Sequence, residues 1–205
     1  MGVKHWWNRT DSRLLEVLLG LAVLLDAVFG VVLPVLGVTG LIDPVANREV
    51  EVGTVSRLTG TVSDPAGHGM TLNGTRRAEL VLAHPDLGQR VLLVLPDVIG
   101  SLFLLLVLIL LFQMARTLRG GDVFVPRNAR RLTVIGLTVL VQAVLSPVLP
   151  TLTTALLVRN TAVAERIPFT ITFSGEYILL ALLLLALSEV FRRGARLRAD
   201  TEGLV

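Results

Sequence analysis

The chain contains no cysteine. Disulfide bonds, thiolate nucleophiles and cysteine-based metal sites are therefore excluded. Only three of the 205 residues are histidines, His5, His68 and His84, and no two of them have the spacing that places metal ligands on one face of a helix. The sequence also lacks a phosphate-binding loop, a Gly-x-Ser-x-Gly motif and a dinucleotide-binding fingerprint. These absences argue against an enzyme and against a bound metal or cofactor.

Charged residues are also scarce, at 17% of the chain against 53% hydrophobic residues. A soluble domain carries about 25% charged residues. The apolar residues form long runs, of which the clearest is residues 96–115, PDVIGSLFLLLVLILLFQMA. A helix of about 20 such residues covers the ~30 Å hydrocarbon core of a bilayer. The sequence therefore predicts an integral membrane protein embedded in the lipid bilayer.

Four apolar runs are long enough to cross a membrane. They are residues 14–41, 96–115, 132–157 and 169–191. The first is longer than a minimal span, so we expect it to tilt or to kink at Pro34. Pro96 suits the first turn of the second span. We predict an all-α membrane protein in which four transmembrane helices form a four-helix bundle.

Residues 42–95 form the longest polar segment. The stretch 49–64, EVEVGTVSRLTGTVSD, is rich in β-branched residues with rough alternation, which favours strands. Asn73-Gly74, between two more apolar stretches, is a two-residue hairpin signal. We therefore expect a small external β-meander of three or four short strands between the first and second spans. It is too small for much core of its own, so we expect it to pack against the span ends.

The distribution of basic residues predicts the topology. The segments 1–13, 116–131 and 192–205 together hold 12 of the 19 lysines and arginines. The segments on the other side of the predicted membrane, 42–95 and 158–168, hold the rest over a greater length. The positive-inside rule therefore places both termini in the cytoplasm of a multi-pass cell-membrane protein. Because the basic residues cluster beside apolar runs, we do not expect direct binding to nucleic acid.

Asp26 lies near the middle of the first predicted span, and no lysine or arginine shares its depth. A charge at the centre of a bilayer costs at least ~2.5–3.5 kcal/mol, so such residues are usually paired, protonated or functional. Gln142 of the third span lies at a similar depth. A protonated Asp26 hydrogen-bonded to Gln142 would either join two helices or act as a proton- or ligand-linked switch.

Two glutamates of the fourth predicted span are further candidates. Glu176, about two turns inside its outer end, would either pair with an arginine of the outer loop or take part in sensing. Glu189 lies at the inner end, with Arg192 and Arg193 three and four residues on. This spacing predicts a local ion pair on one helix face.

Two cytoplasmic stretches carry a family resemblance. They are residues 118–132, LRGGDVFVPRNARRL, and residues 187–205, LSEVFRRGARLRADTEGLV. Both resemble motifs of an uncharacterised family of small bacterial four-span membrane proteins, a domain of unknown function. The end of the tail departs from the family's compact Asp-Leu-Thr-Val form. The matching positions are Gly121, Phe124, Asn128, Leu132, Glu189, Val190, Phe191, Gly194 and Leu197.

The resemblance implies a membrane regulatory or sensory role, because members of the family often accompany a small helix-turn-helix regulator. Phe124 and Phe191 can pack together beneath the inner leaflet, either as part of a docking platform for such a partner or simply as interface anchors. The candidate platform consists of Gly121, Phe124, Asn128, Glu189, Phe191 and Gly194.

The leading functional prediction is a non-enzymatic protein that couples an envelope signal to a cytoplasmic partner. The alternative is a small transporter or immunity-type protein that binds a ligand within the helix bundle near Asp26. Homo-oligomerisation is compatible with either function.

Overall fold

The computed structural model describes residues 9–42, 46–51, 62–63, 71–72, 77–82, 84–119, 126–159, 161, 164 and 167–202. The chain divides into two compact units. The helical unit comprises Met1–Val35, Asp97–Pro147 and Thr172–Val205, and the strand-containing unit comprises Leu36–Pro96 and Val148–Ile171. Several residues singled out in the sequence lie outside the described residues, namely His5, His68, Asn73, Gly74, Gly121 and Phe124.

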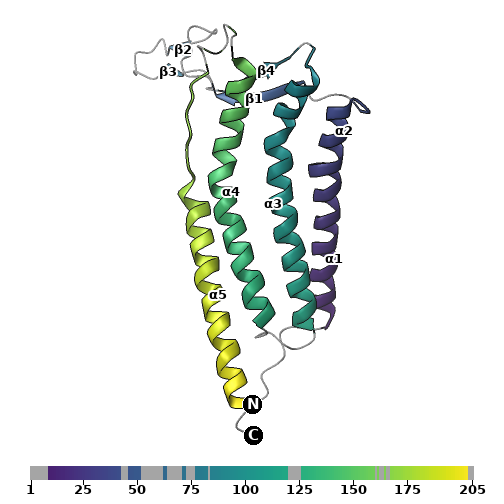
Figure 1. Ribbon diagram of the computed structural model, residues 1–205, viewed down its shortest axis with the longest axis vertical. Coiled ribbons are helices and arrows are strands. Elements are labelled where there is room, and N and C mark those ends of the chain that lie inside the picture. Colours follow the sequence, from purple (N-terminus) through teal and green to yellow (C-terminus); the bar gives the residue numbers. More distant parts are fainter. Residues whose placement is uncertain are drawn as a thin grey trace. The chain divides into compact units, whose positions relative to one another are not determined.

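Helices account for most of the described chain (Figure 1). The first is continuous through α1 (Arg9–Leu25), the π-helical segment η1 (Asp26–Val32) and α2 (Leu33–Thr39), and it is followed by α3 (Leu87–Arg119), α4 (Pro126–Val158) and α5 (Gly175–Glu202). Within the described part of the chain, three helices are long and apolar enough to cross a membrane, at Arg13–Thr39, Leu87–Thr117 and Pro126–Val158. The prediction of membrane-spanning helices is confirmed to that extent.

The fourth predicted span differs from its prediction at the N-terminal end. Residues 168–174 have no regular secondary structure, and α5 begins only at Gly175. β-branched residues such as Thr170 and Thr172 and the preceding Pro168 disfavour a helix here. The uncharged helical stretch between Glu176 and Glu189 is then about 18 Å long at 1.5 Å per residue, short of the ~30 Å needed. A fourth crossing by this segment therefore stays a prediction.

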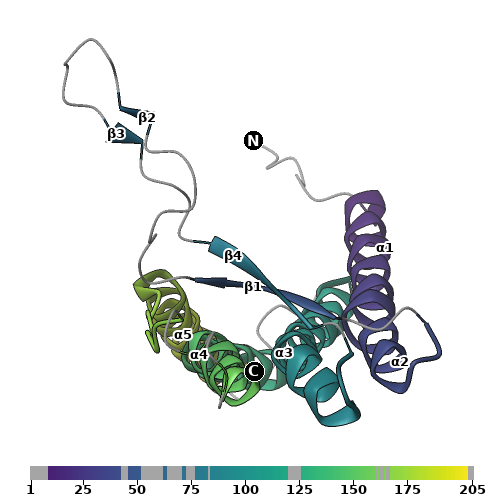
Figure 2. The same cartoon turned by 90° about the horizontal axis from the view of Figure 1, so that it is seen from above.

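Within the helical unit, consecutive neighbours are α1, α3, α4 and α5, with α1 and α5 at the two ends of the row (Figures 1 and 2). Small residues mark the close approaches. A Cβ added to Gly20 of α1 would lie 3.7 Å from the Phe112 ring of α3, and one added to Gly136 of α4 would lie 3.0 Å from Leu185 of α5. This arrangement does not confirm the predicted four-helix bundle.

Pro34 shapes the first helix. Proline has no backbone N–H, so Pro34 cannot donate to the carbonyl of Gly30 one turn earlier. The helix accommodates this by widening, and the Leu33 N–H donates to the Val28 carbonyl five residues back. The expected irregularity thus takes the form of a π-helical segment that begins at Asp26. Such segments occur often at functional sites.

Helix α3 begins earlier than the sequence analysis predicted. Asp86 and Gln89 form a capping box, in which the Gln89 N–H donates to Asp86 Oδ1 at 2.7 Å and the Asp86 N–H donates to Gln89 Oε1 at 3.0 Å. The prediction that Pro96 occupies a first turn is wrong, because Pro96 lies inside α3. The capping box is visible in the sequence and identifies the true start.

The predicted β-meander is wrong in its strand pairing. Strand β1 (Asn47–Glu51) pairs antiparallel with β4 (Arg77–Val81), and β2 (Val62–Ser63) pairs with β3 (Thr71–Leu72). A hairpin at Asn73-Gly74 would instead have paired β3 with β4. Val50 of β1 is buried, as are Leu93 and Val94 of α3 in the same unit. The five-residue β1–β4 register and the burial of Val50 outweigh the turn signal, which acts only locally.

Candidate functional site

A polar layer crosses the helical unit at the level of Asp26. The Ser101 hydroxyl of α3 donates a hydrogen bond to the Asp26 carboxylate. Gly30 follows on the same face of η1, and a Cβ added there would lie 2.7 Å from Ser101 Cβ and 2.8 Å from Asp26 Oδ1. On the α4 side, Gln142 Nε2 would lie 3.4 Å from a Cβ at Gly100. We call these five residues the polar layer.

Two acceptors in the polar layer lack a donor. Asp26 Oδ2 and Gln142 Oε1 are buried and have no hydrogen-bond partner. A proton on Asp26 would convert one of these acceptors into a donor. The sequence predicts Asp26 and Gln142 as site residues but not Ser101, which is the hydrogen-bond partner of Asp26. The signal for Ser101 in the sequence is the Gly100-Ser101 pair, which interrupts an otherwise apolar run.

Asn128 joins the end of α3 to the start of α4. Its side chain is completely buried. The Thr117 hydroxyl donates to Asn128 Oδ1 at 3.0 Å, and Arg131 Nη1 donates to the same oxygen and to the Gln113 carbonyl, each at 3.2 Å. Asn128 therefore holds the two helices that flank the predicted cytoplasmic loop. The predicted platform residues Gly121 and Phe124 lie in that loop, outside the described residues.

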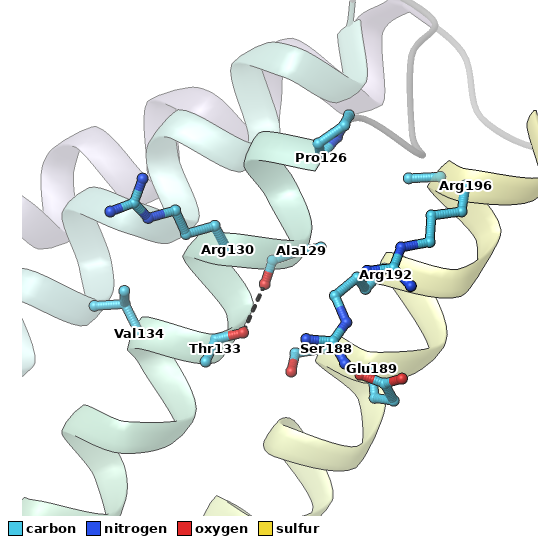
Figure 3. A pocket seen from close by; sticks show the side chains of 10 residues that line it. Pro126, Ala129, Arg130, Thr133, Val134, Ser188, Glu189, Arg192 and Arg196 are labelled. Carbon is cyan, nitrogen blue, oxygen red and sulfur yellow. Dashed lines mark hydrogen bonds and ion pairs between the residues drawn. The ribbon is translucent and has the colours of Figure 1, made fainter. Parts of the chain in front are cut away.

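A groove of about 540 Å³ lies between α4 and α5 (Figure 3). We call it the basic groove because three arginines and a single acid line it. Glu189 forms ion pairs with Arg192 and with Arg193, the second at 2.9 Å. The predicted local ion pair is therefore confirmed. The lining residues are Pro126, Ala129, Arg130, Thr133, Val134, Ser188, Glu189, Arg192, Ala195 and Arg196.

Helix α5 also carries an exposed apolar stripe. Leu187, Val190 and Leu197 are large apolar residues with 42%, 61% and 68% of their surface exposed. Their spacing, with Gly194 between the last two, alternates between three and four residues and keeps them on one face of the helix. Phe191 and Gly194, both predicted platform residues, are partly buried. The stripe continues past Glu189 into the charged part of α5.

Glu176 occupies a different position from the one predicted. It is exposed and lies in the first turn of α5. The prediction that it lies two turns inside a span is wrong because the helix begins at Gly175. A carboxylate in a first turn complements the positive end of the helix dipole, which accounts for its presence there.

Arg48 of β1 makes four hydrogen bonds to α3 and α4, which its sequence context does not predict. Arg48 Nη1 donates to the hydroxyls of Thr153 at 2.7 Å and Thr154 at 3.3 Å, both on α4. Arg48 Nη2 donates to the carbonyls of Leu92, at 3.1 Å, and of Leu93 on α3.

The Leu92 carbonyl is available because of Pro96. In an α-helix this carbonyl would accept from the N–H four residues on, and Pro96 has none. Arg48 supplies the missing donor. No signal in the sequence alone could identify this role, because it depends on Pro96 being inside a helix and on β1 lying beside it.

Comparison with known proteins gives one match. The family model DUF2975, described as a protein of unknown function, matches residues 77–205. The matched part contains α3, α4, α5 and the basic groove, and Asp26 and Arg48 precede it. No curated protein and no solved structure matches the chain.

Proposed function

The chain belongs to DUF2975, a family of unknown function, and from that premise we propose that it is a non-enzymatic membrane protein with a sensory or regulatory role. It would couple a signal in the envelope to a partner in the cytoplasm. The observation that carries this proposal is the contact of Arg48. One side chain of strand β1 binds the backbone of α3 and two hydroxyls of α4.

The Arg48 contact provides an input. A ligand or protein that displaced β1 would withdraw the donor from the Leu92 carbonyl next to Pro96. A proline within a helix is a point at which the helix bends easily. Signalling requires two states. In this proposal they differ in whether Arg48 donates to the Leu92 carbonyl of α3.

The exposed stripe of α5 provides an output. An amphipathic helix of a partner protein can bind an apolar face through residues spaced by three and four. Val190 and Leu197 supply such a face beyond the last apolar turn of α5. The resemblance described above implies a small helix-turn-helix regulator as the candidate partner.

Site-specific photo-crosslinking in native membranes tests this proposal. We expect a photoreactive residue in place of Leu197 to crosslink a cytoplasmic protein, and one in place of the exposed Arg127 of α4 not to do so. Combining the Leu197 probe with Arg48→Met should change the yield severalfold, because the input contact is lost. A crosslinked second copy of the chain would instead indicate a homo-oligomer interface.

The alternative function is a small transporter or immunity-type protein. The two buried acceptors without donors, Asp26 Oδ2 and Gln142 Oε1, favour it, because a bound ligand or proton would supply the missing donor. If the Leu197 and Arg127 probes both crosslink lipid alone, the regulatory proposal is wrong and this alternative takes its place.

A further inference from the structure

The basic groove has an excess of positive charge. Its lining includes Arg130, Arg192 and Arg196 and a single acid, Glu189. Glu189 is already paired with Arg192 and Arg193. Within the described ranges, neither Arg130 nor Arg196 has a hydrogen-bond or ion-pair partner. The groove is therefore suited to a ligand that carries negative charge.

The groove lies where the apolar parts of both helices end. On α4, Arg130 precedes the apolar stretch that starts at Leu132, and on α5, Arg192 follows the stretch that ends at Leu187. Arginines at such a border lie at the level of lipid headgroups in a membrane protein.

The groove has an apolar part as well. Ala129, Val134 and Ala195 line it together with the charged residues. In Figure 3 the side chains of Arg192 and Arg196 extend along α5, whereas the Arg130 guanidinium points away from that helix. A ligand in this groove would thus meet a cationic wall on α5 and small apolar side chains on α4 and α5.

We propose that the basic groove binds the phosphate of an anionic phospholipid. The charge complements a phosphodiester, the small apolar residues suit the glycerol and the first carbons of an acyl chain, and the groove lies at the depth of the headgroups. Basic grooves between transmembrane helices are known to bind such headgroups. This proposal does not depend on the proposed sensory function.

The test compares two double variants that remove the same charge from the same two helices. Arg130→Gln with Arg196→Gln removes charge from the groove, whereas Arg127→Gln with Arg193→Gln removes it from residues outside the lining. Purified full-length protein in phosphatidylcholine nanodiscs is titrated with phosphatidylglycerol. Binding is followed by native mass spectrometry and by the shift in melting temperature.

We expect the groove variant to bind phosphatidylglycerol at least about 10-fold more weakly than the wild type, since a hydrogen bond to a charged group such as a phosphate contributes about 1.5–3 kcal/mol. The control variant should bind within about threefold of the wild type. If the groove variant fails to fold in phosphatidylcholine, Arg196→Gln alone replaces it, with Arg193→Gln as its control.

Two outcomes would overturn the proposal. Equally weakened phosphatidylglycerol binding in both double variants would mean that the lipid is attracted by the general surface charge and not bound by the groove. Protection by inorganic phosphate at millimolar concentration, with no preference for phosphatidylglycerol over phosphatidylcholine, would mean that the groove takes a soluble phosphate.

Discussion

Replacing Gly30 by alanine is expected to destabilise the helical unit, whereas replacing Gly20 by alanine is not. A Cβ at Gly30 would lie 2.7 Å from Ser101 Cβ and 2.8 Å from Asp26 Oδ1. Contacts this short force η1 and α3 apart, and overpacking of this kind costs about 1–3 kcal/mol. A Cβ at Gly20 would lie 3.7 Å from Phe112, which is ordinary contact. Gly20→Ala should be neutral or slightly stabilising because alanine favours a helix.

The comparison is made by unfolding the purified protein in detergent and measuring the melting temperature of each variant. A second change supplies the rescue. Ser101→Gly removes the side chain that the new methyl group would meet, so it should restore part of the stability of Gly30→Ala while it destabilises the wild type. Equal melting temperatures for Gly30→Ala and Gly20→Ala would show that η1 does not pack against Ser101.

Arg48→Met is expected to lower the free energy of unfolding by about 3 kcal/mol or more. Hydrogen bonds to a charged group contribute about 1.5–3 kcal/mol each, and a buried carbonyl left without a donor costs about 1–3 kcal/mol. The methionine retains much of the length and apolar character of the arginine stem but donates no hydrogen bond. Leu92, Thr153 and Thr154 would each lose a donor.

Pro96→Ala provides the decisive partner for this variant. It returns an N–H to α3, which can then donate to the Leu92 carbonyl. The double variant should therefore be less destabilised than the sum of the two single variants, by about 1–2 kcal/mol in a double-mutant cycle. Additivity within about 0.5 kcal/mol would indicate that Arg48 does not serve the carbonyl that Pro96 leaves free.

The long apolar runs predicted the helices well because hydrophobic length is a strong, local signal. The start of α3 was predicted at Pro96, where the uninterrupted apolar run begins. The capping box at Asp86 and Gln89 is an equally local signal and gives the true start of the helix. The start of α5 was placed too early because composition cannot distinguish an extended apolar segment from a helix. Glu189 and its arginines were found because their spacing on a helix determines their contact.

Other parts of the site depend on tertiary neighbours and could not be derived from spacing. Asp26 stood out by its burial cost, but its actual partner, Ser101, depends on which face of α3 meets η1. Arg48 looked like an ordinary basic residue of an external strand. Its role appears only when β1 pairs with β4, against the local turn signal at Asn73-Gly74, and thereby lies beside α3.

The arrangement of the chain in the membrane underlies both proposals, because the α5 stripe and the basic groove must lie on the cytoplasmic side. The wild-type chain has no cysteine, so single-cysteine variants can be labelled without background. Asn73→Cys in the segment predicted to be external and Glu202→Cys at the end of α5 are each exposed to a membrane-impermeant thiol reagent in intact and in permeabilised cells.

We predict that Asn73→Cys is labelled in intact cells and that Glu202→Cys is labelled only after permeabilisation. This result requires α5 and the segment before it to make the fourth crossing, and it places the basic groove at the inner face of the membrane. Labelling of Glu202→Cys in intact cells would contradict the account, because the groove and the α5 stripe would then face the outside.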